Sequence, residues 1–226
     1  MIPIRDTIPA RRTAWIVRLI LLANIGAFIV ELMQGPALEA FLYRFGMVPA
    51  SWGMNSPSDV LRWPAFLTTL VTSQFLHGGL LHLGTNMLYL WIFGDNVEDR
   101  LGHGRFVVLY LGSGLLAGLT QYVVQPQSSV PMIGASGAIA GVLGAYFLSF
   151  PFARVVTLIP LFFVWQFVEL PAFVFLGFWF VLQWLQGITT IGQMAQMGGV
   201  AWWAHVGGFV SGVALAGALR GRQRYF

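Results

Sequence analysis

Long apolar stretches, separated by shorter polar segments, are the main pattern of this chain. Six of them are candidates for membrane helices: 15–33, 80–93, 106–124, 136–150, 172–185 and 202–219. A helix needs about 20 mainly apolar residues to cross the hydrocarbon core of a bilayer, so the shorter stretches reach only part of the way. The pattern predicts an all-α integral membrane protein, built as one bundle of six transmembrane helices with a short fourth helix.

Two connections are unusual for a helical bundle. Residues 34–75 contain several prolines and aromatic residues and are too apolar for a solvated linker. We expect a large first loop that is ordered and lies partly in the membrane interface. Residues 155–170 are apolar, but Pro160 argues against a straight helix. We interpret them as an interfacial segment that leads into the fifth helix, and residues 187–200 as a loop.

The composition agrees with a membrane protein. Of 226 residues, 57% are hydrophobic and 9% are charged, with a mean hydropathy of +0.74. Soluble domains carry about 25% charged residues. The absence of cysteine excludes disulfide bonds and thiol chemistry. The net charge of +4 arises from arginine, and in a membrane protein such charge indicates topology before nucleic-acid binding.

The distribution of arginine predicts the orientation. Six helices place both termini on one side, which collects ten of the 12 basic residues, while the other side has only Arg44 and Arg62. Because cytoplasmic loops carry the excess of basic residues, both termini should be cytoplasmic. We therefore expect a cytoplasmic segment over 1–14, a membrane domain over 15–220 and a basic cytoplasmic tail over 221–226. The second, fourth and sixth helices then begin near the outer face.

The chemistry centres on Gly134-Ala135-Ser136-Gly137, directly before the fourth helix. Small residues let a backbone turn sharply and let another chain approach closely. A serine at a helix N-terminus has a hydroxyl with unpaired backbone N–H groups beside it, which suits a nucleophile with part of an oxyanion hole. The alternative is a capping serine on a tightly packed membrane helix.

Other polar residues gather at the starts of the second and sixth helices. His82 and Asn86 are four residues apart and share a helix face, and His205 lies near the start of the sixth helix. Ionisable groups in spanning segments are costly, which favours a functional interpretation. Alternatively, His82 and Asn86 could join helices, and His205 could be a packing residue. We expect His77 to support the first loop and assign no role to His103.

Rows of small residues can bring these helix starts together. The fourth helix carries Gly137, Gly141 and Ala145, and the sixth carries Ala204, Gly208, Gly212 and Ala216. Such rows let membrane helices approach closely. Packing one row on the other puts Ser136 and His205 at similar depth, where an imidazole can activate a hydroxyl. His82, Asn86 and the backbone N–H of Ser136 can then donate to an oxyanion.

Three motifs resemble the signatures of rhomboid intramembrane serine proteases: Gly134-Ala135-Ser136-Gly137, His82-Leu-Gly-Thr-Asn86 and Ala204-His205-Val-Gly-Gly208. Val97-Glu98-Asp99-Arg100-Leu101-Gly102 is similar to the family's segment after the second helix, and the resemblance covers about residues 77–212. It implies a six-helix rhomboid-like bundle and a Ser–His dyad without a third acid, with Ser136 as nucleophile and His205 as general base and acid. It also implies oxyanion donors from His82, Asn86 and the backbone N–H groups of Ala135 and Ser136. We expect structural support from His77, Gly134, Gly137, Gly141 and Gly208.

Two features depart from the family pattern. Many rhomboids have an aromatic residue four positions after the serine, stacked on the catalytic histidine, whereas this chain has Ala140. Another group must therefore hold the ring of His205. The Trp-Arg dipeptide of the family's first loop is missing, since Arg62-Trp63 has the reverse order.

A fourth helix of about 22 Å would place Ser136 below the outer surface, so that hydrolysis needs a water-filled cavity open to that face.

Three functions compete on this sequence. The first is an intramembrane serine endopeptidase that cleaves single-span transmembrane proteins near the outer face. The second is a catalytically inactive relative that binds membrane helices. The third, a small transporter or channel, is disfavoured because the mid-span positions are read as apolar. The lack of a His-Glu-x-x-His motif disfavours a metalloprotease, and Asp95 lacks a partner for an aspartyl site. We expect no cofactor, no metal and no nucleic-acid partner, and a multi-pass protein in the lipid bilayer of a bacterial inner (plasma) membrane.

Overall fold

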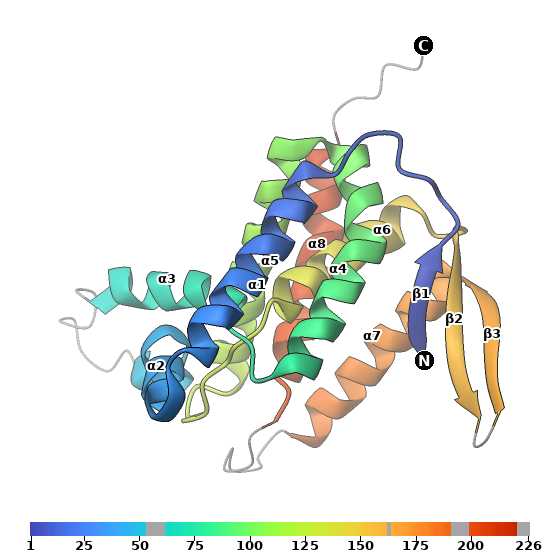
Figure 1. The fold of residues 1–226 in the computed structure, drawn as a ribbon. Helices are drawn as coiled ribbons and strands as arrows, with labels where there is room; N and C mark the ends of the chain where they lie inside the picture. Colours follow the sequence, from blue (N-terminus) through green and yellow to red (C-terminus); the bar gives the residue numbers. More distant parts are fainter. Residues whose placement is uncertain (53–61, 162–163, 191–198, 221–226) are drawn as a thin grey trace.

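The structure is a computed structural model that describes residues 1–52, 62–161, 164–190 and 199–220 (Figure 1). Helices occupy all the predicted positions: α1 (Trp15–Leu32), α4 (Leu80–Leu101), α5 (His103–Val124), α6 (Ser136–Ser149), α7 (Ala172–Thr189) and α8 (Trp202–Leu219). Among the described residues, α1, α5, α7 and α8 are long and apolar enough to cross a membrane, and α6 is a shorter apolar helix. The chain is therefore a multi-pass membrane protein.

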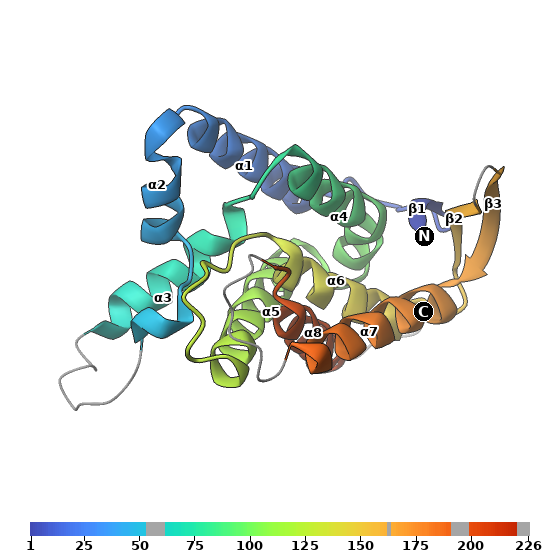
Figure 2. The same cartoon turned by 90° about the horizontal axis from the view of Figure 1, so that it is seen from below.

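The short helix α6 is the centre of the bundle. Figure 2 shows it enclosed by α4, α5, α7 and α8, each of which contacts it. Every residue of α6 from 137 to 146 is buried. A methyl group added at Gly208 of α8 would overlap the carbonyl oxygen of Gly137, and one added at Gly144 would overlap the carbonyl of Phe209. Because these positions lack side chains, α6 and α8 pack with their backbones in contact.

The connection between α1 and α4 folds into short helices. Its described residues form α2 (Leu38–Phe45), α3 (Trp63–Thr72) and the 3-10 turns η1 (Gly35–Ala37), η2 (Pro49–Trp52) and η4 (Ser73–Phe75). A small apolar cluster of Met47, Phe66 and Leu70 holds this region together, and the Met132 backbone pairs with that of Met47. Pro57, one of the prolines in the predicted loop, lies outside the described residues. The connection between α1 and α4 thus contacts the loop that precedes α6.

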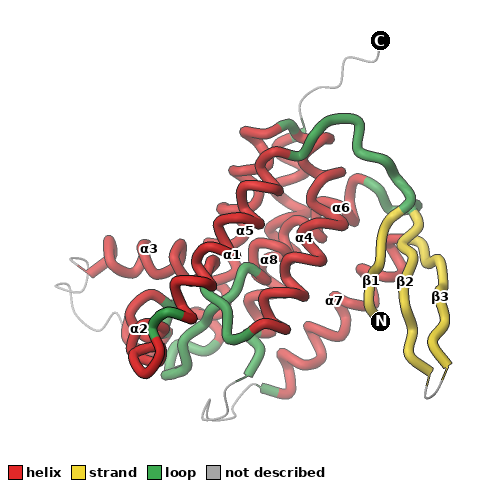
Figure 3. Tube along the Cα trace, viewed as in Figure 1, coloured by secondary structure: helices red, strands yellow, loops and turns green. Residues whose placement is uncertain are grey.

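The prediction of an all-α fold was wrong in one region. Strands β2 (Arg154–Leu161) and β3 (Val164–Pro171) form an antiparallel hairpin in the stretch that we interpreted as an interfacial segment leading into the fifth helix. Strand β1 (Ile2–Asp6), within the expected N-terminal segment, pairs with β2 and is an edge strand of an antiparallel sheet ordered β1-β2-β3 (Figure 3). The run of β-branched residues at 155–157 favours a strand, and Pro160 lies beyond the part of β2 that pairs with β1, so it leaves no bond to β1 unmade.

Two boundaries also differ from the prediction. Helix α7 continues to Thr189, four residues beyond the predicted end at residue 185, so it takes up the start of the expected loop 187–200. Helix α4 runs to Leu101 and ends at Gly102, which has a φ of +82°. Most of the remaining loop and the tail at 221–226 lie outside the described residues.

Candidate active site

Gly134 brings the chain to Ser136 by a conformation that other residues rarely adopt. Its φ is +122°, and a Cβ built on it would lie 2.7 Å from the His82 Nε2 atom. Its backbone N–H donates to the Ser73 carbonyl oxygen at 2.9 Å, which anchors the turn to η4. Glycine is therefore required by both backbone shape and space. The turn places Ser136 as the first residue of α6, directly below the His82 ring.

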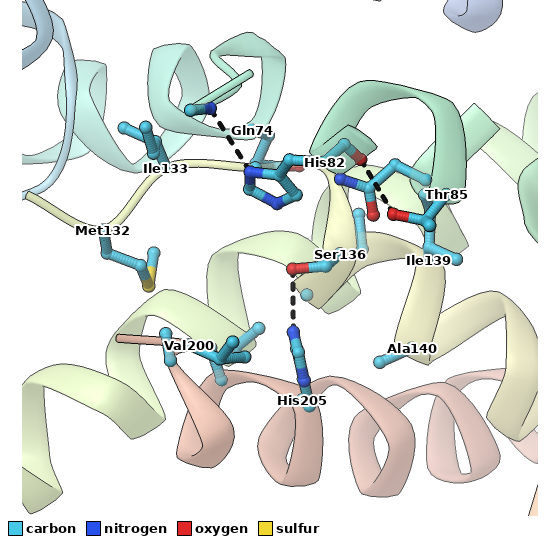
Figure 4. A pocket seen from close by; sticks show the side chains of 18 of the residues that line it. Gln74, His82, Thr85, Met132, Ile133, Ser136, Ile139, Ala140, Val200 and His205 are labelled. Carbon is cyan, nitrogen blue, oxygen red and sulfur yellow. Dashed lines mark hydrogen bonds between the residues drawn. The ribbon is translucent and has the colours of Figure 1, made fainter. Parts of the chain in front are cut away.

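Ser136 and His205 form a hydrogen-bonded pair. The Ser136 Oγ atom lies 2.8 Å from the His205 Nε2 atom, and the two side chains come from α6 and α8 (Figure 4). Only 8% of His205 is exposed. This is the geometry in which an imidazole can take the proton of a hydroxyl as that hydroxyl attacks a carbon atom.

The His205 ring is held from α7. Its Nδ1 atom lies 2.7 Å from the Gln183 Oε1 atom. The Trp179 ring, one turn earlier on α7, lies 5.8 Å away between centroids at an angle of 32°, and the Trp202 ring presents its edge at 6.1 Å. Gln183 was not among the site residues predicted from the sequence, because the interior of each span was read as apolar, which was wrong here. The available signal was a polar residue within an otherwise apolar span.

Hydrogen-bond donors line the side of Ser136 opposite His205. The His82 Nδ1 atom accepts a bond from the Gly78 N–H at 3.3 Å, which leaves Nε2 to carry the ring proton and point toward Gly134 and Ser136. Asn86, one turn along α4, is buried, and its amide Nδ2 has no hydrogen-bond partner in the described part of the chain. The N–H groups at the start of α6, near Ala135 and Ser136, have no acceptor within the helix.

One cavity joins these groups. Its volume is about 1130 Å³, and its lining includes the dyad, His82, Asn86 and Gln183. Segments 130–134 and 199–202 form other parts of its wall. A cavity of this size with several polar groups can hold water beside Ser136.

His77 lies beside the site and outside the long helices. Its backbone N–H donates to both carboxylate oxygens of Glu31 on α1, at 3.0 and 3.2 Å. Its ring packs edge-on against His82, with centroids 5.1 Å apart. Burial, with the nearby His82, lowers the pKa of His77 from 6.5 to about 4. The neutral His77 ring therefore packs against the His82 ring and is in a position to orient it.

The three supporting glycines of α6 and α8 have different neighbours. A Cβ on Gly137 would lie 2.7 Å from the Ala117 Cβ of α5, and one on Gly208 would overlap the Gly137 carbonyl. Gly141 was expected at the contact with α8, and its backbone lies there, because a Cβ built on Gly212 would overlap it. Its own missing side chain points at Ser113 of α5, with the Gly208 carbonyl oxygen at 3.3 Å. Helix α6 is therefore wedged between two helices.

Comparison with known proteins gives consistent matches. The family model described as Rhomboid domain matches residues 64–222. Rhomboid protease GluP of Bacillus subtilis is 37% identical over 118 residues, covering 52% of this chain and 21% of that protein. Rhomboid protein 1, mitochondrial, of Saccharomyces cerevisiae is 32% identical over 196 residues, covering 85% and 50%. The human presenilin-associated rhomboid-like protein, mitochondrial, is 32% identical over 146 residues, covering 63% and 35%.

The matched region contains the residues of the site. This chain spans between about a fifth and about a half of the length of these three relatives. The family model itself covers more than half of the 226 residues and includes α4, α6 and α8, which supply the serine, the histidines and the asparagine around the cavity. The chain therefore belongs to the rhomboid family.

Proposed function

We propose that this protein is an intramembrane serine endopeptidase with a Ser136–His205 dyad. The observation that carries the proposal is the 2.8 Å contact between Ser136 Oγ and His205 Nε2 inside a cavity lined by polar groups. A serine hydroxyl is a weak nucleophile until a base takes its proton, and the imidazole is placed to do so.

The proposed reaction has two halves. His205 Nε2 takes the hydroxyl proton as Ser136 Oγ attacks the carbonyl carbon of the scissile peptide, and then gives that proton to the leaving amine nitrogen. This leaves an ester on Ser136. Water then attacks the ester carbon while His205 removes its proton, and the proton returns to Ser136 Oγ as the carboxylic acid product departs.

Negative charge develops on the carbonyl oxygen in both halves. His82 Nε2–H, Asn86 Nδ2–H and the backbone N–H groups of Ala135 and Ser136 are the proposed donors to that oxygen. Such donors act because they are fixed before the charge appears, in a site with little competing water. The unpaired amide of Asn86 supports this role, since a buried donor without a partner is costly unless a substrate uses it.

The proposed substrates are single-span transmembrane proteins, cut near the outer face. Helix α6 has 14 residues, about 21 Å, against a hydrocarbon core of about 30 Å. A serine at its start lies inside the membrane when its other end is near the opposite surface. The arginine distribution favours cytoplasmic termini, and thus an active site toward the outside. The proposed location of this multi-pass protein is a bacterial inner membrane.

The test is proteolysis of a generic single-span substrate by the purified protein in detergent. Wild type should cleave it, Ser136→Ala and His205→Ala should not, and Ser211→Ala on α8 should behave as wild type. A fluorophosphonate probe should label the wild-type protein and Ser211→Ala but not Ser136→Ala. Binding of the substrate without cleavage by wild type would instead identify an inactive rhomboid-like protein that binds membrane helices.

A further inference from the structure

The two ring nitrogens of His205 have different partners. Nε2 faces the Ser136 hydroxyl at 2.8 Å, and Nδ1 faces the Gln183 amide oxygen at 2.7 Å. A neutral imidazole carries one proton, and an amide oxygen can only accept a bond. The Gln183 contact therefore requires the proton on Nδ1, which leaves the lone pair on Nε2, where a base for Ser136 needs it.

A second bond fixes which end of the Gln183 amide meets His205. The Gln183 Nε2 atom donates to the Trp179 carbonyl oxygen at 3.3 Å, so the Oε1 atom is the end that faces the ring. Gln183 is 7% exposed, and little water can replace either bond. The amide thus has one orientation, and this orientation selects one tautomer of His205.

The same helix also supports the face of the ring. Trp179 lies 5.8 Å from the His205 ring, tilted by 32°. On α6, the residue four positions after Ser136 is Ala140, whose methyl group cannot provide an aromatic surface. The ring is therefore oriented mainly by α7, through one hydrogen bond and one aromatic contact, and the edge of Trp202 at the start of α8 is a further contact.

We propose that Gln183 is a positioning residue for His205, which it holds in the base-competent tautomer and orientation. This inference rests on the proposed protease function. Gln183 occupies the place that a carboxylate takes in a Ser–His–Asp triad, but it is neutral, so it orients the ring without adding charge. Besides His205, the titratable side chains among the described residues that line the cavity are His82 and Tyr89, both on α4.

Two substitutions at Gln183 separate positioning from packing. Gln183→Leu keeps the approximate volume and removes the acceptor. It should lower kcat, and the rate at which a fluorophosphonate labels Ser136, by about tenfold to a hundredfold with KM little changed, the scale found when the orienting partner of a metal-bound histidine is removed. Gln186→Leu on the exposed side of α7 is the matched control and should leave both rates as in wild type.

Gln183→Glu keeps an acceptor but adds a negative charge. It should restore turnover at high pH and move the acid limb of the pH–rate profile to higher pH, because a carboxylate stabilises the protonated imidazole. Wild-type kinetics in Gln183→Leu would overturn the inference. So would an inactive Gln183→Leu together with a Gln183→Glu profile that does not move.

Three further outcomes are also decisive. If Gln183→Leu fails to fold, the pH–rate profile of Gln183→Glu decides the question by itself. Cleavage that persists in Ser136→Ala would overturn the protease proposal. An inactive Ser136→Ala combined with a fully active Gln183→Leu would overturn only the role of Gln183.

Discussion

At the scale of single residues, the site contains buried side chains that keep a hydrogen-bond donor available for a substrate. Asn86 is buried, and its amide N–H has no partner among the described residues. His82 uses its Nδ1 atom to accept from Gly78, so its Nε2–H remains available. Both side chains face the cavity from the same side of α4. A site that binds a developing oxyanion requires such donors in advance.

Removing one of these donors should impair catalysis more than folding. Asn86→Ala and His82→Ala should each lower kcat by about tenfold to a thousandfold, the scale for one oxyanion donor. The check is cleavage of the generic substrate, with the thermal unfolding midpoint measured on the same samples. A variant that loses stability and activity in proportion would show that the residue joins helices instead of binding the oxyanion.

His77 predicts a dependence of stability on pH. Its pKa falls from 6.5 to about 4 in the folded protein, so the unfolded chain takes up a proton before the folded one does. Stability from this residue is therefore complete above pH 6.5 and is lost as the pH falls toward 4. His77→Gln lacks the titrating group.

The measurement for His77 is the thermal unfolding midpoint of wild type and His77→Gln over this pH range. The wild-type midpoint should decline more steeply on acidification than that of His77→Gln, because only the wild type carries this titrating ring. Parallel curves would contradict the buried, neutral state of His77.

At the scale of elements, the dyad depends on contact between two helices. Lipid supplies no hydrophobic force between membrane helices, so close packing of small residues holds α6 against α8. Gly208 meets the backbone of Gly137, whereas Gly217 on the same helix has only Leu148 Cδ2 at 4.0 Å from a built Cβ. The two glycines therefore differ in the space around them.

Gly208→Ala should disrupt the site, and Gly217→Ala should not. The added methyl at residue 208 must push α6 and α8 apart, at a cost of about 1–3 kcal/mol, and the misaligned dyad should lose most of its activity. At residue 217 alanine should be neutral or stabilising, because it favours a helix more than glycine does. Activity and unfolding midpoints of both variants test this, and an active Gly208→Ala would refute the helix contact.

The sheet shows how distant elements are joined at this scale. Strand β2 lies between β1 and β3, and the hairpin leads directly into α7, which carries Trp179 and Gln183. Ala172, the first residue of α7, donates its N–H to the Ala153 carbonyl oxygen at 2.7 Å. The base of the hairpin thus fixes where α7 begins.

At the scale of the whole molecule, Asp6 ties the N-terminal strand to the bundle. Its Oδ2 atom accepts a bond from the Tyr146 hydroxyl of α6 at 2.6 Å and one from the Asn96 amide of α4 at 2.8 Å. Burial raises the pKa of Asp6, and the bond from Tyr146 opposes this shift. The strand therefore contacts the helix that begins with Ser136, at the far end of that helix.

The proposed orientation predicts which ends of the helices are accessible from outside. The chain has no cysteine, so single cysteines can be introduced at Gln127, near the start of α6, and at Arg105, at the start of α5. In intact cells a membrane-impermeant thiol reagent should label the cysteine at residue 127 and not that at 105. The reverse result would place the active site toward the cytoplasm.

The sequence by itself determined the helices and the residues that meet at the site. Apolar runs specify membrane helices because the bilayer penalises unpaired backbone groups and polar side chains, and this cost does not depend on how the helices pack. Because polar side chains carry the same cost, His82, Asn86 and His205 stand out in the sequence as candidates for a function. The positions of these helices and motifs were thus predictable from local composition, as was family membership.

Only the tertiary structure decided which groups surround those residues. Gln183 meets His205 because α7 packs on α8, and Gly141 faces Ser113 because α6 also contacts α5. The pairing of β1 with β2 was missed for the same reason: Ile2 pairs with Leu158, and no local pattern encodes a pairing between segments so far apart. The β2–β3 hairpin is different, because its β-branched run at 155–157 was a local signal for a strand. Contacts of this kind depend on how elements pack against each other, so the support of the catalytic base emerges only from the assembled bundle.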